Sequence, residues 1–513
     1  MKSINFSSFS LSLLGGLTML SCAEKQEQAN RAPNIIYIMS DDHTSQAVSA
    51  YGGILANVMP TPNIDRIANE GVKMNNCFVT NSISTPSRAA ILTGQYSQKN
   101  GVYTLADRID PEHPNMAKDL QEAGYNTAII GKWHLGTEPS GFDYYNVLPG
   151  QGRYRNPLLI EKGMWGDDPT GKDRTPKEYE GHSTDIITNE AIKFMDGRDK
   201  DEPFFLMCHY KAPHRSWVPA ERFEDLLKDV TVPEPANLYD NYDGKGEYTD
   251  LLRMSMEHLT ENDLKTEIPK GMTRDEQRAW AYQIYIKDYL RCIAGIDENV
   301  GRLLQYLDDN NLTDNTVIVY TGDQGFFLGE HGWFDKRMMH EESLRMPFLM
   351  RYPNEIKAGS VNDDIVMNVD FAPLLLDYAG LETPSQMQGE SFRKNITGEK
   401  PGRKSMYYRY WMNADGSHNV PAHYGIRTDR YKLIFFYAKS LGMAGTKELP
   451  LQPEWELYDL KEDPMEMKNI YNAAENKDLI KELKTELLEL KKQYGDEDEN
   501  FPEMKELASQ YYW

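Results

Sequence analysis

The 513-residue sequence has few cysteines and a shortage of positive charge, and both absences exclude whole classes of function. Its four cysteines form no CxxC pair and no Cys/His cluster at metal-ligand spacing, which excludes zinc-finger and thioredoxin-type sites. The 56 Lys and Arg residues are outnumbered by 79 Asp and Glu residues, giving a formal net charge of −23. So acidic a chain is not expected to bind nucleic acid, and it can bind an anionic substrate only where its few cations converge in one cleft.

The N-terminal segment has the pattern of a secretory signal. Lys2 precedes an apolar stretch at residues 9–20 that is too short and too broken to span a bilayer. Leu20-Ser21-Cys22-Ala23 resembles a bacterial lipobox. It predicts a lipoprotein signal peptide over residues 1–21, export, and a lipid anchor at Cys22 as the only membrane attachment, in the periplasm or at the cell surface. A plain signal peptide with an incidental cysteine is the alternative.

The other three cysteines lie in apolar surroundings. We expect them to be buried thiols, with one disulfide as the alternative in an oxidising compartment. They are Cys77, Cys208 and Cys292.

Apolar runs typical of buried parallel strands alternate with segments of helical spacing up to about residue 380. This order predicts an α/β fold with an open, mostly parallel sheet flanked by helices, and a site beyond the carboxyl ends of its strands. The composition becomes polar and rich in Pro and Gly between residues 383 and 403, so we place a boundary between residues 22–385 and 386–513. The smaller part is expected to hold an antiparallel sheet and a terminal helix.

The stretch from Ser84 to Gly94 is the most informative in the chain. Pro86 suits the first turn of a helix, which places Ser84 at the helix mouth, where backbone N–H groups and the helix dipole favour an anion. Arg88 adds a positive charge one turn further on. Ser84 is therefore a candidate nucleophile for an anionic ester, and an ordinary N-cap serine is the alternative.

Charged residues follow several predicted strands. Asp41, Asp42, Asp323 and Gln324 offer the hard oxygen ligands that calcium or magnesium prefers, although each pair alone is more often a turn or a helix cap. Candidate cations and histidines also follow strands, with surface or structural roles as their alternatives. They are Lys132, His134, His214 and Lys336.

The pattern Ser84-x-Pro86-Ser87-Arg88-x-x-x-Leu92-Thr93-Gly94 resembles the signature of formylglycine-dependent sulfatases, in the serine-type form used by anaerobic bacteria. The strand-end motifs match in the same order, and the resemblance covers nearly the whole chain after residue 22. It implies an alkaline-phosphatase-like fold in which residues 22–385 form the catalytic domain and residues 386–513 complete the substrate pocket.

The resemblance also implies a role for each residue. A maturation enzyme would oxidise Ser84 to formylglycine, whose hydrated aldehyde attacks the sulfate ester. One calcium ion would be bound by Asp41, Asp42, Asp323, Gln324 and residue 84; the family often has Asn in place of Gln324, and both offer an amide oxygen. Lys132 and Lys336 would neutralise sulfate oxygens, and Arg88 would hold the nucleophile. His214 would protonate the leaving alcohol, and His134 would take the proton whose loss expels sulfate and restores the aldehyde.

Within the family, Lys211 to Trp217 and His423 to Ile434 most resemble enzymes acting on the 6-O-sulfate of N-acetylglucosamine, in heparan-sulfate fragments or mucin glycans. Asp335, Arg337 and His423 are the candidate sugar-binding residues. A sulfatase for another sulfate position, a phosphoesterase of the same superfamily with unmodified Ser84, and a lipid-anchored glycan-binding protein without turnover are the alternatives.

Overall fold

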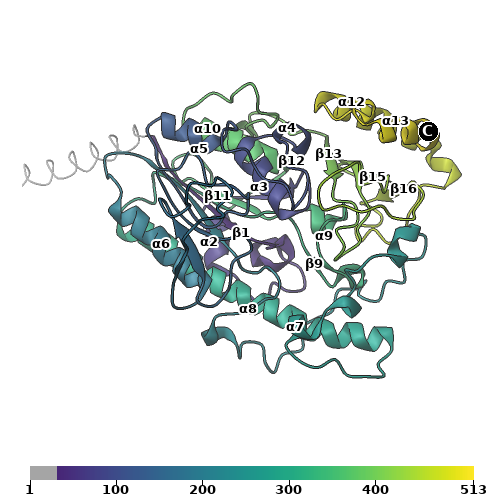
Figure 1. The fold of residues 1–513 in the computed structure, drawn as a ribbon, viewed down its shortest axis with the longest axis horizontal. Coiled ribbons are helices and arrows are strands. Elements are labelled where there is room, and N and C mark those ends of the chain that lie inside the picture. The colour runs from purple at the N-terminus through teal and green to yellow at the C-terminus, as the bar shows by residue number, and fades with distance from the viewer. Residues whose placement is uncertain (1–31) are drawn as a thin grey trace, which may run out of the picture.

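The computed structural model describes residues 32–513 and is built around a ten-stranded mixed sheet (Figure 1). The strand order is β12-β2-β11-β8-β1-β7-β3-β4-β5-β6, and β8, β1, β7, β3 and β4 run parallel to one another. The strands are β1 (Asn34–Ser40), β2 (Val72–Phe78), β3 (Asn126–Lys132), β4 (Tyr144–Leu148), β5 (Leu158–Glu161), β6 (Lys177–Glu178), β7 (Phe204–Tyr210), β8 (Thr316–Gly322), β11 (Phe348–Arg351) and β12 (Ser360–Met367).

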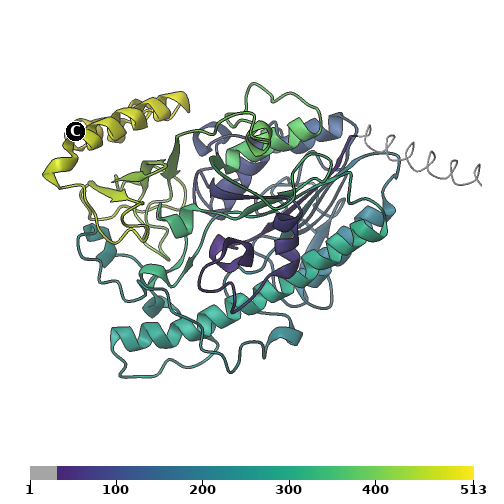
Figure 2. The same cartoon turned by 180° about the vertical axis from the view of Figure 1, so that it is seen from behind.

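The central strands are buried on both faces, which explains their continuous apolar sequences. In β1, Ile35, Tyr37 and Met39 point into one core, and Ile36 and Ile38 point into the other. Helices α3, α5 and α10 supply the first core, and helices α2, α6 and α8 supply the second (Figures 1 and 2). Their bounds are α2 (Pro62–Asn69), α3 (Ser84–Thr93), α5 (Met116–Glu122), α6 (Ser183–Gly197), α8 (Arg274–Asp309) and α10 (Phe371–Tyr378).

The longest helix of the described residues, α8, has 36 residues. Thr273 and Glu276 form a capping box at its start, which satisfies two backbone N–H groups there. β6 has only two residues, both exposed, so no hydrophobic pattern marks it.

The C-terminal part contains the expected antiparallel sheet, with the strand order β13-β14-β15-β16. Helices α12 and α13 lie over this sheet, and α13 was not predicted (Figure 1). The strands are β13 (Ser405–Tyr410), β14 (His423–Thr428), β15 (Tyr431–Phe436) and β16 (Glu454–Asp459), and the helices are α12 (Lys477–Gln493) and α13 (Pro502–Tyr511).

The remaining elements are short. Strands β9 (Phe327–Leu328) and β10 (Phe334–Asp335) form a small hairpin, and short helices are α4 (Ser97–Asn100), α7 (Glu261–Leu264), α9 (Glu341–Leu344) and α11 (Arg393–Ile396). The three cysteines of the described region, Cys77, Cys208 and Cys292, are free and buried, as expected. The α/β fold with a smaller antiparallel sheet is confirmed.

Candidate active site

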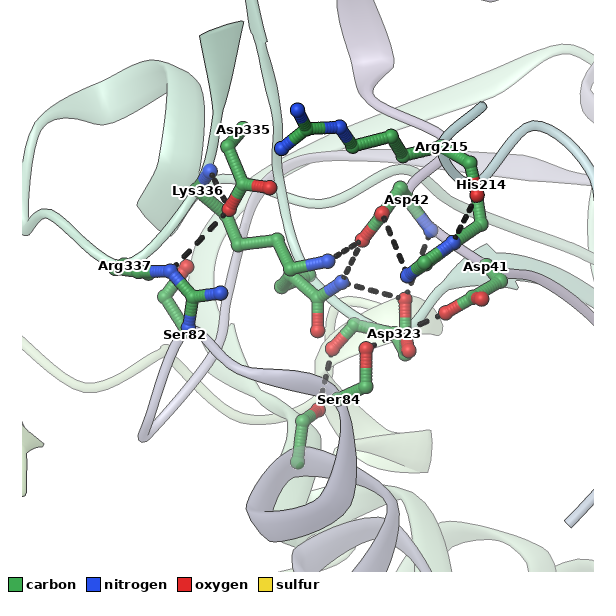
Figure 3. A network of polar contacts seen from close by, with 12 residues as sticks. Asp41, Asp42, Ser82, Ser84, His214, Arg215, Asp323, Asp335, Lys336 and Arg337 are labelled. Atoms are coloured by element: carbon green, nitrogen blue, oxygen red, sulfur yellow. Dashed lines mark hydrogen bonds and ion pairs between the residues drawn. The ribbon is translucent and has the colours of Figure 1, made fainter. Parts of the chain in front are cut away.

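The carboxyl ends of three parallel strands bring charged residues to one edge of the large sheet. Asp41 and Asp42 follow β1, Lys132 ends β3, and Asp323 follows β8. The paired strands have fixed registers, so these ends lie at the same level. Oxygen atoms of Asp41, Asp42 and Asp323 all lie within 4.8 Å of one another (Figure 3).

Two glycines allow these strand ends to approach their neighbours closely. Gly131 precedes Lys132 and has a φ of +100°, and a Cβ at this position would lie 2.0 Å from His209 O. Gly322 precedes Asp323, and a Cβ there would lie 2.4 Å from His43 O. Only glycine fits both positions without displacing backbone.

Ser84 is the first residue of α3 and enters the carboxylate cluster from below the sheet edge (Figure 3). Its Oγ donates a hydrogen bond to Asp41 Oδ1 at 3.3 Å, and the residue is 2% exposed. The predicted helix mouth is therefore present, and it faces charged groups. Ser84 has no capping hydrogen bond to make at this position, since Ile83 is the N-cap residue.

Arg88 lies one turn along α3 and joins the two strand ends. Its guanidinium contacts Asp41 Oδ1 at 3.2 Å and Asp323 Oδ2 at 3.0 Å, and it donates to Lys132 O at 2.7 Å. The side chain is almost fully buried, so these charge-assisted hydrogen bonds are not screened by solvent.

Two lysines contact different carboxylates of the cluster. Lys132 Nζ donates to Asp41 Oδ2 and, at 2.6 Å, to Gln151 Oε1. Lys336 follows β10, and its Nζ lies 2.5 Å from Asp42 Oδ1 (Figure 3). Both lysines are buried, so the cations of this acidic chain do converge in one place.

The oxygens at the centre fit a metal ion. Asp42 Oδ2 and Gln324 Oε1 are buried and have no hydrogen-bond partner among the described residues. Leaving such atoms unpaired is costly, and a hard divalent cation would satisfy them. Asp41, Asp42 and Asp323 are therefore suited to hold the predicted ion together with residue 84. Gln324 donates from Nε2 to Asp42 and, at 2.8 Å, to Asp323 Oδ1, so its amide would have to turn over for Oε1 to join them.

The charges shift the pKa values of the acidic residues in opposite directions. Burial alone would raise the pKa of Asp41, but Lys132, His214 and Arg88 hold it well below its usual value. Burial raises the pKa of Asp42 to about 7, although Lys336 opposes the shift. Burial and the charge of Asp41 also raise the pKa of Asp323. A bound cation would favour the ionised form of all three.

The two histidines lie at the open side of the cluster. His214 Nδ1 is 2.6 Å from Arg215 O, and its Nε2 is 3.8 Å from Asp42 Oδ2 (Figure 3). A carbonyl only accepts, so Nδ1 carries a proton and Nε2 faces the site. His134 is half-buried, and its Nδ1 lies 3.5 Å from Thr85 Oγ1. Burial and then the charge of Lys132 lower the pKa of both rings well below the usual value.

The hairpin that carries Lys336 also brings Asp335 and Arg337 to the cluster, with a contact that the sequence did not reveal. Asp335 Oδ2 lies 3.3 Å from His418 Nε2, and His418 Nδ1 lies 2.7 Å from Asp415 Oδ2. Arg337 contacts the same Asp415 at 3.2 Å. Asp415 and His418 lie in the loop between β13 and β14, and no periodicity or motif marks them.

His423, the third predicted sugar-binding residue, lies elsewhere. Its ring is fully buried against Tyr408, Tyr410 and Phe436, and its Nδ1 is 2.8 Å from Pro421 O. We find no polar contact between His423 and the carboxylate cluster within residues 32–513. Of the C-terminal residues, His418 makes the contact expected of His423.

Two family models match the chain. The model described as Sulfatase matches residues 33–381, which is more than half of the sequence. The chain belongs to the sulfatase family. The model described as N-sulphoglucosamine sulphohydrolase, C-terminal, matches residues 329–493 of this sulfatase.

Known proteins give the same assignment. An N-acetylglucosamine-6-O-sulfatase of Bacteroides thetaiotaomicron is 45% identical over 96% of this chain and 92% of its own length. The structure of BT4656 in complex with its substrate D-glucosamine-2-N,6-O-disulfate shares 44% sequence identity and a TM-score of 0.81, covering 91% of this chain and 99% of that chain. Phosphonate monoester hydrolase of Agrobacterium radiobacter, at 20% identity and a TM-score of 0.70 over 90% of this chain and 96% of its own, shares the fold. The chain is a sulfuric ester hydrolase with an alkaline-phosphatase-like fold.

Proposed function

We propose that this sulfatase removes the 6-O-sulfate of N-acetylglucosamine residues in a host glycan, such as heparan-sulfate fragments or mucin glycans. The observation that carries the proposal is the 45% identity, over nearly the full length of both chains, to an enzyme of that name. The ligand of the similar solved structure, a glucosamine with a 6-O-sulfate, supports the same sugar class.

We propose that Ser84 is the precursor of formylglycine. A sulfate ester formed on a plain serine would have to be hydrolysed by water, whereas a hydrated aldehyde offers a second hydroxyl whose deprotonation expels sulfate. The position of Ser84 at the helix mouth, beside Arg88 and Asp41, supports this role because it aims the reacting group at an anion-binding position. Formylglycine has two hydrogens fewer than serine, so mass spectrometry of the peptide that contains residue 84 tests the proposal.

The predicted calcium ion would supply positive charge to the sulfate oxygens. This chain's lysines would do the same, because Lys132 reaches the cluster at Asp41 and Lys336 reaches it at Asp42. Arg88 keeps Asp41 and Asp323 in place and would orient the hydroxyl at residue 84. Preorganised charges of this kind cost no rearrangement when charge spreads in the transition state.

Proton transfer is assigned to the two histidines. His214 already holds a proton on Nδ1 through Arg215 O, so Nε2 is the atom that would donate to the leaving alcohol of the sugar. The negative charge of the bound sulfate ester would favour this doubly protonated form. His134 lies beside Thr85, the residue next to Ser84, where its ring would accept the proton that must leave before sulfate is released.

Sugar recognition is assigned to Asp335 and Arg337, with His418 and Asp415 holding their charged groups in place. Burial would raise the pKa of Asp335, but His418, Arg337 and Lys336 keep it well below its usual value. The carboxylate therefore stays ionised and can accept hydrogen bonds from sugar hydroxyls.

We also propose that the protein is exported, matured by a formylglycine-generating enzyme and anchored by lipid at Cys22. The signal peptide and Cys22 lie outside the described residues. In the described part of the chain, no helix is both long enough and apolar enough to cross a bilayer. Labelling with an azide-bearing fatty acid and its loss on Cys22→Ala would test the anchor.

The matured enzyme can be assayed on monosaccharides sulfated at the 6-O, 4-O, 3-O and 2-O positions, with sulfate release as the readout. We expect turnover of 6-O-sulfated N-acetylglucosamine. Turnover of another isomer in its place would contradict the substrate and leave the sulfatase assignment intact. Protein produced without the maturation enzyme should contain unmodified Ser84 and release no sulfate.

A further inference from the structure

A cavity of about 350 Å³ opens beside His134. Thr85, the residue after the predicted nucleophile, and His134 form its inner wall. Its size is within the range of small-ligand pockets. The cavity therefore borders the proposed reaction position through these two residues, and none of the residues given catalytic roles, apart from His134, lines it.

The cavity is lined by two arginines, Arg108 and Arg174. Within residues 32–513, neither guanidinium hydrogen-bonds or ion-pairs with another residue. Asp107 is the acidic residue of the lining, but its Oδ2 accepts hydrogen bonds from Tyr103 N at 2.9 Å and Thr104 N at 2.8 Å. Asp107 is thus engaged by its own loop, and the lining carries two arginines against one carboxylate, an excess of positive charge in a chain whose net charge is −23.

Both arginine stems are packed against the protein. A Cβ on Gly136 would lie 2.6 Å from Arg108 Cγ, so the stem of Arg108 runs directly over Gly136. A Cβ on Gly171 would lie 3.1 Å from the Trp165 ring and 3.2 Å from Arg174 Cδ, so the stem of Arg174 lies beside this tryptophan. Stems held in this way leave less conformational entropy to lose when the guanidinium groups bind an anion.

From the position of the cavity, its charge and its supported arginines, we infer that it binds a second anionic group of the glycan, distinct from the sulfate that is cleaved. The inference rests on the proposed function, because it treats the substrate as a sulfated glycan. The anionic group is a carboxylate or a sulfate. A guanidinium recognises either of them through paired hydrogen bonds. The group can belong to the same sugar, as an N-sulfate, or to a neighbouring uronate.

The test uses the double variant Arg108→Gln/Arg174→Gln and three substrates. One is N-acetylglucosamine 6-O-sulfate, which has no second anion. The second is D-glucosamine-2-N,6-O-disulfate, which carries the anion on the same ring. The third is a disaccharide in which a uronate precedes the 6-O-sulfated N-acetylglucosamine. Arg153→Gln is the matched control, since Arg153 is an exposed arginine paired with Glu178.

We expect the double variant to raise KM about tenfold or more for at least one of the two doubly charged substrates, with kcat unchanged. The singly charged substrate and the control variant should keep wild-type KM values. A rise for the disulfate alone assigns the cavity to a sulfate on the reacting sugar, and a rise for the disaccharide alone assigns it to a neighbouring carboxylate. The difference in KM between the double variant and the wild-type enzyme should shrink at high ionic strength, because salt screens the attraction between the arginines and the substrate anion.

The ratio of the KM of the double variant to the KM of the wild-type enzyme would overturn the inference if it were the same for all three substrates. This holds whether the variant is impaired on all of them or on none. Thermal melting of each variant shows whether a uniform loss comes from unfolding. Failure of the wild-type enzyme on 6-O-sulfated N-acetylglucosamine would contradict the proposed function. If the wild-type enzyme turns over this substrate and the ratio of variant to wild-type KM is the same for all three substrates, only the second anion site is contradicted.

Discussion

The edge of the large sheet and the C-terminal four-stranded sheet contribute to the active site in different ways. Asp41, Lys132 and Asp323 lie at or directly after the ends of β1, β3 and β8, where the hydrogen-bonded ladder fixes their spacing. Asp415 and His418 lie in a loop between β13 and β14, outside any ladder. The groups proposed to react are therefore set by a rigid sheet edge, whereas a loop of the second sheet positions the residues assigned to the sugar.

A side chain within a strand of the small sheet is buried in that sheet, whereas a side chain in the preceding loop can reach the candidate site. His423 is the first residue of β14, and its ring is buried among aromatic side chains, whereas His418, five positions earlier, reaches Asp335. A regular strand directs alternate side chains into its own core, and so it offers fewer of them to a distant site. Variants at the edge of the large sheet should therefore change the rate of reaction, and variants in the loop between β13 and β14 should change sugar binding.

The largest effect is expected at the sheet edge, from Ser84→Ala. Ser84 is the proposed precursor of the nucleophile, so its removal should lower sulfate release by about a thousandfold or more. The measurement is sulfate release by the matured protein, with mass spectrometry of the wild-type residue 84 in parallel.

Ser82→Ala is the control for this change. Ser82 lies two positions earlier and its Oγ donates to Ser343 O at 2.7 Å. Losing that hydrogen bond should lower the free energy of unfolding by about 1–2 kcal/mol and leave kcat nearly unchanged. If Ser84→Ala retained substantial turnover, the nucleophile would have to be sought outside the sheet edge.

Metal removal should have the next largest effect. A chelator is expected to lower kcat by about a hundredfold or more, because the sulfate then meets unscreened carboxylates, and calcium should restore it. Calcium at about a hundred times its dissociation constant should also raise the free energy of unfolding by about 2.7 kcal/mol, seen as a higher melting temperature.

Asp323→Asn should abolish that calcium-dependent rise in melting temperature. Asp185→Asn is the matched control, because Asp185 pairs with Arg222 on the surface of the molecule. An undiminished calcium response in Asp323→Asn would place the ion away from the β1 and β8 ends. A response to magnesium and none to calcium would revise the identity of the metal.

The two histidines of the C-terminal part should separate binding from stability. His418→Ala is expected to raise KM about tenfold, because Asp335 loses the partner that holds its carboxylate. His423→Ala should lower the free energy of unfolding by about 3 kcal/mol by leaving a cavity among Tyr408, Tyr410 and Phe436, with little change in kcat/KM of the folded protein. Substrate kinetics and denaturant unfolding of both variants measure the contrast, and the opposite pattern would restore His423 as the sugar-binding residue.

This contrast marks how far the sequence could predict the site. The apolar strands ending in Asp41 or Asp323 are visible as patterns, and so is the Ser84 helix with Pro86 in its first turn. The loop positions of Asp415 and His418 depend on how the two sheets pack, which no local pattern encodes. Gln151, which accepts from Lys132, was missed for the same reason, since it lies in a turn between glycines.

The smallest effect is expected away from the edge, at Asp297 on α8. Its carboxylate accepts from Asn63 N at 3.0 Å and Ile64 N at 2.9 Å at the start of α2, and burial raises its pKa to about 6. An unfolded aspartate has a pKa of about 3.9, so the native state holds a proton that the unfolded state releases between these values. Stability from this group is present below about pH 4 and is lost as the pH rises to about 6, by about 2–3 kcal/mol.

Asp297→Asn should remove this part of the pH dependence, because asparagine stays neutral and still accepts from the helix N–H groups. Denaturant unfolding of both proteins from pH 4 to pH 7 gives the difference in slope, and kcat should agree within about twofold because Asp297 lies outside the catalytic edge. Parallel curves for the two proteins would mean that the carboxyl titrates normally in the folded state. A large fall in kcat would mean that the supporting helices and the catalytic edge are coupled, so that the rigid edge depends on more than its own strands.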